Sequence, residues 1–349
     1  MTILPLREAL RQPYVIGTET AQTEGMSDNA DWEIPEEARP HPPDYTFDLE
    51  QALSSIVALR ARIPEDAFTA SILGTERGGN GVVIREDGLV LTIGYLITEA
   101  ETVWLTTAGG QALQGYAVGY DQTTGFGLVQ ALGRVKLPAL PLGSVSEVGV
   151  GDDVVVAGHG GLRRSLAARV TGKREFAGYW EYVLDEALFT SPAHPNWGGT
   201  GVIGPSGRLI GIGSLHVQER KGKGQIDVNM SVPIDLLTPI LDDILRQGRP
   251  RQPARPWLGM YTMEAEGHLV VAGLAGGGPA ARAGIKIGDL VLAVAGEPVK
   301  NLAPLFRRVW SLGPAGVEIP ITLSRDGRTV ETKIRSANRS DFLKSPRLH

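Results

Sequence analysis

Short apolar runs separated by tight turns dominate the chain from Phe68 to about Val232. The runs are rich in valine, isoleucine and leucine, and turn sequences such as Glu86-Asp87-Gly88 separate them. Strands at this spacing predict barrels or a sandwich rather than βαβ units. The predicted strands are residues 81–84, 89–92, 102–106, 128–131, 153–157, 169–171, 183–184 and 209–212.

Apolar residues recur at helical spacing in three further segments. The first spans residues 48–63, where Gln51 follows Asp48 as a capping partner. The second covers residues 232–245, and the third covers residues 302–312. We therefore expect three helices in addition to the strands.

Three segments have the composition of arms or linkers. Residues 27–45 are acidic and proline-rich with little to bury, which predicts a mobile arm. Residues 246–254 read RQGRPRQPA and predict a linker, and residues 338–349 form a basic, polar tail. A second β-rich unit lies between the linker and the tail.

The composition narrows the class of protein. The chain has 349 residues, enough for two or three compact units. Its 45 glycines and 23 prolines, with few aromatic residues, favour an all-β class. A net charge of −5 with mixed signs gives no broad basic field, so we expect no nucleic-acid partner. The absence of cysteine excludes disulfides and thiolate chemistry.

The first 25 residues give an expectation about location. Arginines break their short apolar pattern, and no continuous hydrophobic stretch ends in small residues. We expect neither a cleavable signal peptide nor a membrane span. This expectation favours the cytoplasm over the periplasm.

A glycine-rich turn at residues 194–201, HPNWGGTG, carries the main chemical signal. It is laid out like the nucleophile loop of a trypsin-type serine protease, in which a tight turn aims a serine hydroxyl and two backbone N–H groups at one carbonyl carbon. Here the nucleophile position is Gly198, and Asn196 and Trp197 occupy the former oxyanion loop.

The order of motifs along the chain resembles the HtrA (Deg) family, in which a trypsin-like protease domain precedes a PDZ domain. Residues 79–92 (GNGVVI, then DGLVLT) are similar to the opening of the family's first barrel. The family's general-base histidine then matches Tyr95, and the aspartate that orients it matches Gly125 within GYDQTTGFGLV. The nucleophile loop N-P-G-N-S-G-G-P-L maps without a gap onto residues 194–202, with Gly198 at the serine. The resemblance implies that all three triad residues are missing.

These substitutions remove the atoms that triad chemistry needs. Imidazole accepts a proton near neutral pH, whereas a phenol with a pKa of about 10 is a poor general base. Glycine at position 125 offers no acceptor, and glycine at position 198 offers no nucleophile. We expect no catalytic residue. The six histidines are scattered without ligand spacing, so we also expect no metal and no cofactor.

The second unit resembles the PDZ domains of this family. Residues 255–260 (RPWLGM) resemble the carboxylate-binding segment that opens them, and residues 278–291 match the P-A-x-x-A-G-L-x-x-G-D-x-I run. In such a domain an extended peptide adds to a sheet edge, and its terminal carboxylate meets backbone N–H groups. The predicted peptide-binding residues are Trp257, Leu258, Gly259, Met260, Leu305 and Val309. Two alternatives stay open: Leu305 and Val309 face the domain core, and Trp257 packs against the barrel.

The sequence therefore predicts an all-β protein, a trypsin-like double β-barrel followed by a PDZ domain. The expected division is a mobile N-terminal arm (1–47), a double-barrel domain (48–245), a linker (246–254), a PDZ domain (255–337) and a basic tail (338–349).

The resemblance implies an HtrA-like pseudoprotease of bacterial protein quality control. Such a protein is a non-catalytic scaffold that binds polypeptide C-termini or unfolded segments, or a regulatory subunit that acts with a partner protein. The resemblance also implies self-association as a trimer through residues 45–65. Two alternatives remain: a serine endopeptidase with rearranged residues, with Ser191 beside His194, and a structural module whose PDZ groove is closed.

Overall fold

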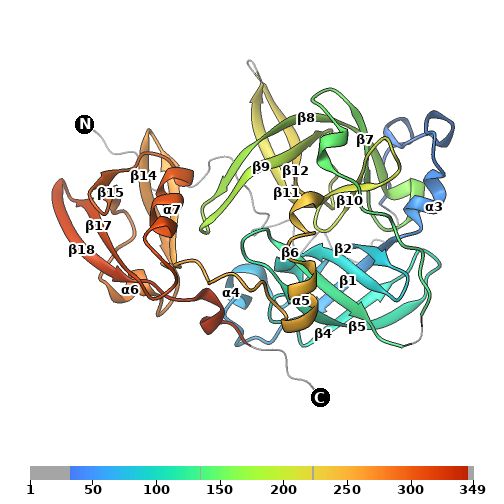
Figure 1. The fold of residues 1–349 in the computed structure, drawn as a ribbon. Helices are drawn as coiled ribbons and strands as arrows, with labels where there is room; N and C mark the ends of the chain where they lie inside the picture. Colours follow the sequence, from blue (N-terminus) through green and yellow to red (C-terminus); the bar gives the residue numbers. More distant parts are fainter. Residues whose placement is uncertain (1–31, 134, 222–223, 345–349) are drawn as a thin grey trace. The chain divides into compact units, whose positions relative to one another are not determined.

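The computed structural model describes residues 32–133, 135–221 and 224–344 (Figure 1). The described chain divides into two compact units. The larger unit holds residues 32–174 and 186–250 with Lys344, and the smaller holds Glu175–Asp185 and Arg251–Leu343. Most of the predicted arm, residues 1–31, and the end of the predicted tail, residues 345–349, lie outside the described residues.

The larger unit contains two closed barrels of six strands each, and every strand that the sequence predicted falls within an observed strand. The first barrel has the order β1 (Ile56–Arg62), β2 (Glu76–Arg85), β3 (Leu89–Ile93), β6 (Phe126–Ala131), β5 (Ala112–Tyr120) and β4 (Thr102–Thr106). The second has the order β10 (Gly201–Ile203), β11 (Leu209–Lys221), β12 (Gly224–Pro233), β9 (Tyr182–Ser191), β8 (Ser165–Gly178) and β7 (Asp153–Ala157).

Short helical turns connect the strands of this unit. They are α4 (Ala70–Leu73), η3 (Gly94–Leu96), η4 (Val145–Glu147) and η5 (Gly161–Arg164). The predicted helix over residues 232–245 is interrupted: η6 (Ile234–Leu236) and α5 (Leu241–Gln247) are separate, and Gly248 ends α5 with a φ of 73°. Glycine ends helices in this way because it has no side chain to strain the left-handed backbone.

The helix predicted over residues 48–63 is wrong in its second half. Only α3 (Leu49–Leu53) is helical, and the Asp48 side chain accepts a hydrogen bond from the Gln51 N–H at 2.9 Å. The chain then enters strand β1, whose residues pair with both β2 and β4. Barrel closure supplies ladder hydrogen bonds on both sides of β1, and this tertiary pairing outweighs the weak local helical pattern.

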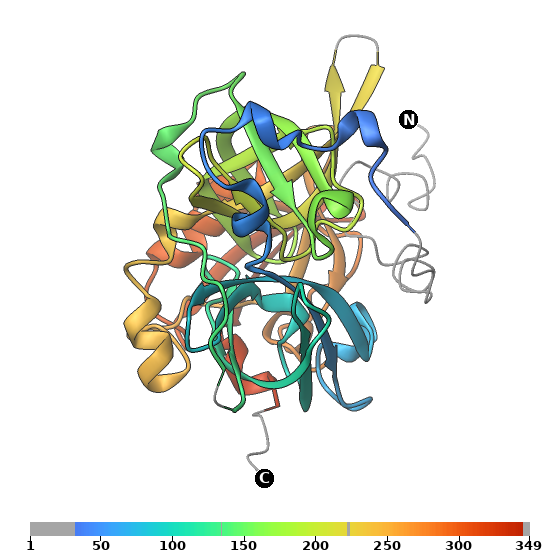
Figure 2. The ribbon, with the colours of Figure 1, turned by 90° about the vertical axis from the view of Figure 1, so that its right-hand side faces the viewer.

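Residues 32–47, predicted to be part of a mobile arm, pack onto the second barrel instead. Ile34 is 3% exposed, joins the apolar core of that barrel, and donates its N–H to the Arg163 carbonyl at 2.9 Å. Figure 2 shows this segment, with η1 (Glu36–Ala38) and η2 (Pro42–Asp44), crossing the second barrel before the chain enters β1. Burial of one large apolar side chain anchors a segment that is otherwise polar.

The smaller unit is built on an antiparallel sheet. Its strand order is β13 (Met260–Ala265), β14 (His268–Leu274), β15 (Leu290–Val294), β17 (Glu318–Arg325) and β18 (Arg328–Arg335), and β16 (Glu297–Pro298) pairs with β15. The helices are α6 (Pro279–Arg282), α7 (Leu302–Ser311) and η7 (Arg339–Phe342). The predicted third helix is confirmed as α7. Strand β13 lies at the end of the strand order, so one of its edges is not paired within this sheet.

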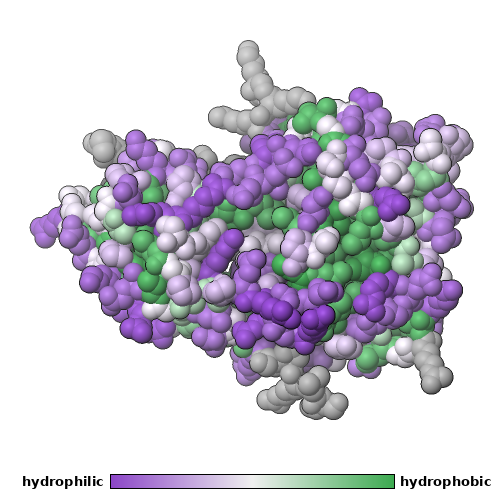
Figure 3. All heavy atoms as spheres, viewed as in Figure 1, coloured by the Kyte–Doolittle hydropathy of each residue, from purple (hydrophilic) through white to green (hydrophobic). Residues whose placement is uncertain are grey.

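The fold class predicted from the sequence is confirmed: the protein is mostly β, with two six-stranded barrels followed by a smaller sheet. Figure 3 shows a mostly hydrophilic face, with a hydrophobic area on the two-barrel unit. None of the helices in the described ranges has the length and apolar character that a membrane crossing needs.

Candidate functional site

The structure brings the three positions predicted to replace the triad close together. Tyr95 lies in η3 at the end of β3, and Gly198 lies in the loop between β9 and β10. A Cβ atom built on Gly198 would lie 2.9 Å from the Tyr95 hydroxyl. The Gly94 N–H, next to Tyr95, donates to the Gly125 carbonyl at 2.7 Å.

The chemistry at these positions offers no proton acceptor at neutral pH. The Tyr95 hydroxyl donates a hydrogen bond to the Ser214 carbonyl at 2.9 Å. Burial raises the pKa of Tyr95 above its usual range, and a hydrogen bond with Trp197 opposes that shift only in part. The phenol therefore stays protonated, and neither glycine carries a side chain that could attack or accept a proton.

Asn80, on β2, holds the glycine-rich loop in place. Its backbone N–H donates to the Gly198 carbonyl at 2.8 Å, and its side-chain Nδ2 donates to the Asn196 carbonyl at 3.0 Å. The loop also needs glycine at position 199, where φ is 76° and a Cβ would lie 1.9 Å from the Asn80 carbonyl oxygen. The sequence reasoning missed this role of Asn80, because the contact joins residues 116 and 118 positions apart.

His194 accepts a hydrogen bond from one backbone N–H group of the predicted oxyanion loop. The Asn196 N–H donates to His194 Nδ1 at 3.1 Å, and His194 Nε2 lies 2.9 Å from the Arg164 carbonyl. This pattern assigns the proton to Nε2. Burial lowers the pKa of His194, which keeps the ring neutral. The Asn196 amide is therefore directed at an imidazole and not at a substrate oxygen. The Trp197 carbonyl accepts a hydrogen bond from the Thr200 hydroxyl at 2.9 Å.

Ser191 and His194 are engaged with different partners. The Ser191 hydroxyl donates to the Asp227 carbonyl at 3.3 Å, whereas both ring nitrogens of His194 bond backbone groups. Geometry of this kind lacks the hydrogen bond between nucleophile and base that serine catalysis uses. Within the described ranges, no group of three or more histidine, aspartate or glutamate side chains could hold a metal ion.

Arg77, which the sequence reasoning did not single out, fastens η3. It is buried, and its guanidinium donates to the carbonyls of Tyr95 at 2.7 Å and Thr98 at 3.0 Å and to the Thr69 hydroxyl at 2.7 Å. Burial lowers the pKa of Arg77 to about 10, and the charge of Glu99 opposes the shift. The position of Tyr95 is thus fixed by a buried cation.

The predicted carboxylate-binding segment of the smaller unit does hold a carboxylate, and that carboxylate belongs to the chain itself. The N–H groups of Leu258, Gly259 and Met260 all donate to the side chain of Glu181. Gly259 has a φ of 66°, and a Cβ there would lie 3.0 Å from the Trp257 ring. Glycine therefore lets three successive N–H groups converge on one anion.

The other predicted peptide-binding residues are buried. Leu305 and Val309 of α7 belong to the apolar core of the smaller unit, at 0% and 1% exposure. Trp257 packs against Phe342, with ring centroids 4.8 Å apart, and its N–H donates to the Ala337 carbonyl at 3.0 Å. Glu264 of β13 accepts the Leu302 N–H at 2.8 Å and so ties the start of α7 to this strand.

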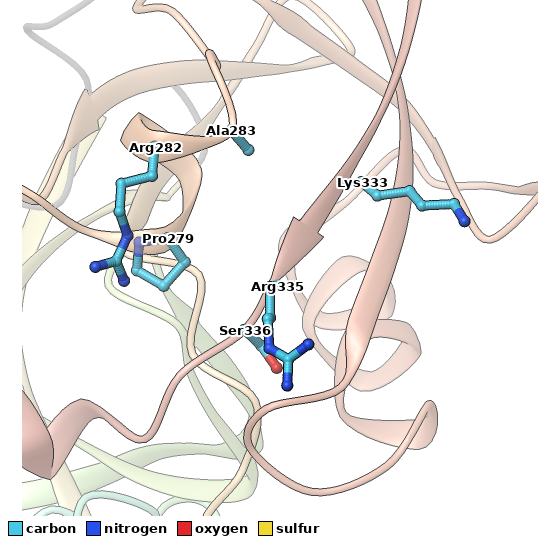
Figure 4. Close-up of a pocket in the computed structure, with 6 residues that line it drawn as sticks. All are labelled: Pro279, Arg282, Ala283, Lys333, Arg335 and Ser336. Atoms are coloured by element: carbon cyan, nitrogen blue, oxygen red, sulfur yellow. The ribbon is translucent and has the colours of Figure 1, made fainter.

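An open pocket of about 400 Å³ lies elsewhere in the smaller unit, lined by Pro279, Arg282, Ala283, Lys333, Arg335 and Ser336 (Figure 4). Its basic side chains do not converge on one point in this view. Arg282 stacks over Phe342, and Lys333 lies 3.9 Å from Glu318. The pocket has no arrangement of groups that selects a ligand.

Two family models match the chain. The trypsin-like peptidase domain matches residues 79–212, and the PDZ domain matches residues 256–335. The fold and the motif order thus define a trypsin-like peptidase domain joined to a PDZ domain.

The curated proteins that are similar to this chain are named as serine endoproteases. A probable periplasmic serine endoprotease DegP-like from Rhizobium meliloti (strain 1021) is 29% identical over 286 residues, which cover 77% of this chain and 55% of that protein. The serine endoprotease DegS of Salmonella typhimurium (strain 14028s / SGSC 2262) is 23% identical over 310 residues, 84% of this chain and 85% of that protein. In its two domains and in these relatives, the chain is similar to the HtrA (Deg) family, a trypsin-like peptidase domain joined to a PDZ domain.

Two quantities limit what these comparisons show: the share of each relative that the chain covers, and the similarity of the folds. The chain spans about half the length of the DegP-like relatives, 55% and 54% of the first two. Among solved structures, the HtrA-type protease AlgW with decapeptide aligns with a TM-score of 0.51 at 19% identity, covering 86% of this chain and 98% of that chain. This likeness concerns the fold.

Proposed function

We propose that this chain is an HtrA-like pseudoprotease, a non-catalytic polypeptide-binding or regulatory scaffold that uses its PDZ groove. The observation that carries the proposal is the pair formed by Tyr95 and Gly198, where a protonated phenol faces a residue without a side chain. A serine protease needs a base and a nucleophile in these places.

The geometry of the loop supports the same proposal. Catalysis of acyl transfer relies on N–H groups aimed at the developing oxyanion, whereas the Asn196 N–H is bonded to His194. The endopeptidase alternative would require Ser191 and His194 to act together, and each is engaged with a different backbone carbonyl.

Peptide binding is the activity that the second domain supports. Backbone N–H groups of residues 258–260 form a carboxylate cradle beside the edge strand β13. Such a cradle suits a polypeptide C-terminus, because a terminal carboxylate and an extended backbone can be bound together. A solved HtrA-type relative of the same fold was determined with a decapeptide. We propose domain boundaries at 48–245 and 255–337, with 246–254 as the linker.

The test of the non-catalytic proposal combines a covalent probe with a substrate. We expect the 349-residue chain to remain unlabelled by a fluorophosphonate and to leave unfolded casein intact, under conditions in which trypsin reacts with both. Labelling that Ser191→Ala abolishes, and that the matched exposed-serine variant Ser146→Ala leaves unchanged, would overturn the proposal in favour of the endopeptidase.

A further inference from the structure

The tip of the hairpin between β8 and β9 belongs to the smaller unit. Strands β8 and β9 are barrel strands, yet residues Glu175–Asp185 cluster with Arg251–Leu343. The turn itself consists of Tyr179, Trp180 and Glu181. This part of the hairpin therefore contributes to the unit that carries the carboxylate cradle.

The Glu181 carboxylate fills that cradle. Its oxygens accept the N–H groups of Leu258 at 3.0 Å, Gly259 at 2.8 Å and Met260 at 3.2 Å, and the residue is 8% exposed. A peptide C-terminus would need the same three donors for its own carboxylate. The two anions cannot be bound at once.

The backbone of the hairpin tip also bonds the edge strand, as the backbone of a bound peptide would. The Thr262 N–H, on the edge strand β13, donates to the Tyr179 carbonyl at 3.2 Å. Thr262 follows Met260 by two residues, and Tyr179 precedes Glu181 by two residues. A peptide that adds to a sheet edge is held at such two-residue steps, because the side chains and the hydrogen-bonding groups of a strand alternate.

An apolar side chain of the hairpin enters the core beside the cradle. Val183 is 7% exposed and belongs to the same buried cluster as Leu258, Met260, Leu305 and Val309. Those four residues are among the six predicted peptide-binding residues. The hairpin thus contributes an apolar side chain to the core that these residues share.

The turn is shaped to present the carboxylate. Glu181 has a φ of 63°, a left-handed conformation that strains a residue with a long side chain. Trp180 stacks on Tyr182, with centroids 5.6 Å apart, and lies over Gly178, where a Cβ would meet the indole at 2.5 Å. Arg307 of α7 bonds Glu175 and Asp185 on the two sides of the hairpin.

We propose that residues Tyr179–Val183 are an internal ligand of the PDZ groove, in which the Glu181 side chain takes the place of a terminal carboxylate. An external polypeptide C-terminus then binds only by displacing this tip. This internal ligand extends the proposed peptide-binding function, and the peptide titration that tests it below rests on that function.

The experiment compares two glutamates with the same backbone geometry. Glu181→Gly removes the carboxylate and also suits the left-handed φ, so the turn keeps its shape. Glu266, in the exposed turn after β13, has a φ of 49° and contacts none of the cradle donors, so Glu266→Gly is the matched control. Both variants are made in the full chain.

The first arm needs no ligand. Hydrogen–deuterium exchange of the amides at 258–260 should be at least about tenfold faster in Glu181→Gly than in the wild type, because these donors lose their hydrogen bonds to the Glu181 carboxyl group. Glu266→Gly should match the wild type. Unchanged protection in Glu181→Gly overturns the proposal.

The second arm uses an eight-residue synthetic peptide that ends in Tyr-Trp-Val with a free carboxylate, and its C-terminal amide as a control. We expect Glu181→Gly to bind the free acid at least about tenfold more tightly than the wild type and Glu266→Gly do. Equal binding by all three proteins overturns the internal ligand and leaves peptide binding intact. Faster exchange in Glu181→Gly without peptide binding by any protein supports the internal ligand and counts against the proposed peptide-binding function.

Discussion

Gly198 and Gly199 are neighbours, but the backbone requires glycine only at position 199. There the left-handed φ and the 1.9 Å approach to the Asn80 carbonyl leave no room for a side chain. At position 198 the nearest obstacle to a Cβ is the Tyr95 hydroxyl, which is the far end of a side chain. The backbone conformation therefore does not require glycine at position 198, where only the Tyr95 side chain opposes a Cβ.

This difference predicts unequal effects on stability. We expect Gly199→Ala to lower the free energy of unfolding by at least about 2 kcal/mol, because a left-handed alanine is strained and the loop must move away from β2. The matched variant Gly198→Ala should cost less than Gly199→Ala does, because the Tyr95 side chain has to shift but the backbone does not. Urea unfolding followed by circular dichroism measures both, and equal losses would contradict the expectation.

Sequence reasoning at the residue scale found what local patterns encode. The glycines of the 194–201 turn and of the 257–260 segment have short, recognisable contexts; in the structure the first turn bonds Asn80 of β2, and the second segment leads into β13. Sequence reasoning did not find the role of Glu181, because its partners lie 77 to 79 residues further along the chain. The only local sign was a glutamate in an aromatic turn, and such a residue is usually solvated.

At the scale of the element, docking of the β8–β9 hairpin depends on the charge state of one carboxyl group. Burial raises the pKa of Glu181 to about 7 from its ordinary value of 4.5, against the hydrogen bonds of residues 258–260 and the charge of Arg339. Tyr179 and Tyr261 are the other ionisable groups beside it, and their own pKa values are raised. Between these two pH values the docked hairpin holds a proton that a solvated hairpin has lost.

Docking is therefore predicted to be tightest at low pH and to weaken as the pH rises from about 4.5 to about 7. Exchange protection of the amides at 258–260, corrected for the intrinsic exchange rate, should fall between about pH 5 and about pH 7.5 in the wild type. Glu181→Gln does not titrate, so its protection should stay level across this range. Parallel curves for the two proteins would refute the prediction.

Elements were predictable where burial and periodicity agree. Helix α7 was predicted because its apolar residues face one core throughout. Leu49, Leu53 and Ile56 match a helical period, so the pattern predicts a helix that runs into strand β1, whereas barrel pairing decides the structure there. The same holds for Ile34, whose burial depends on a barrel that begins more than a hundred residues later.

At the scale of the whole molecule, the smaller unit is assembled from two stretches of chain. Its core includes Val183, which the sequence alone would assign only to the barrel. A PDZ fragment cut at the linker would therefore lack part of its own core. The proposed boundary at residue 255 marks the homologous domain and not the complete folding unit.

A fragment of residues 251–343 is predicted to be less stable than the same fragment fused to residues 175–185 through a glycine–serine linker. The loss should be about 2 kcal/mol, the contribution of one buried valine, with further loss from the cradle. The shorter fragment should also bind the Tyr-Trp-Val peptide more tightly than the full chain does. Urea unfolding and fluorescence titration measure these effects, and identical stability of the two fragments would rule out a structural role for the hairpin.

The split origin of this core has a consequence for biosynthesis. The aromatic tip, with Phe176, Trp180 and Tyr182, leaves the ribosome 76 to 82 residues before Leu258, the first residue of its cradle. Chains emerge N-terminus first. Each nascent molecule therefore passes through a stage in which the barrels can close, but the segment that binds the tip has not yet been made. Every newly made copy thus exposes these aromatic side chains until residues 258–260 have been translated.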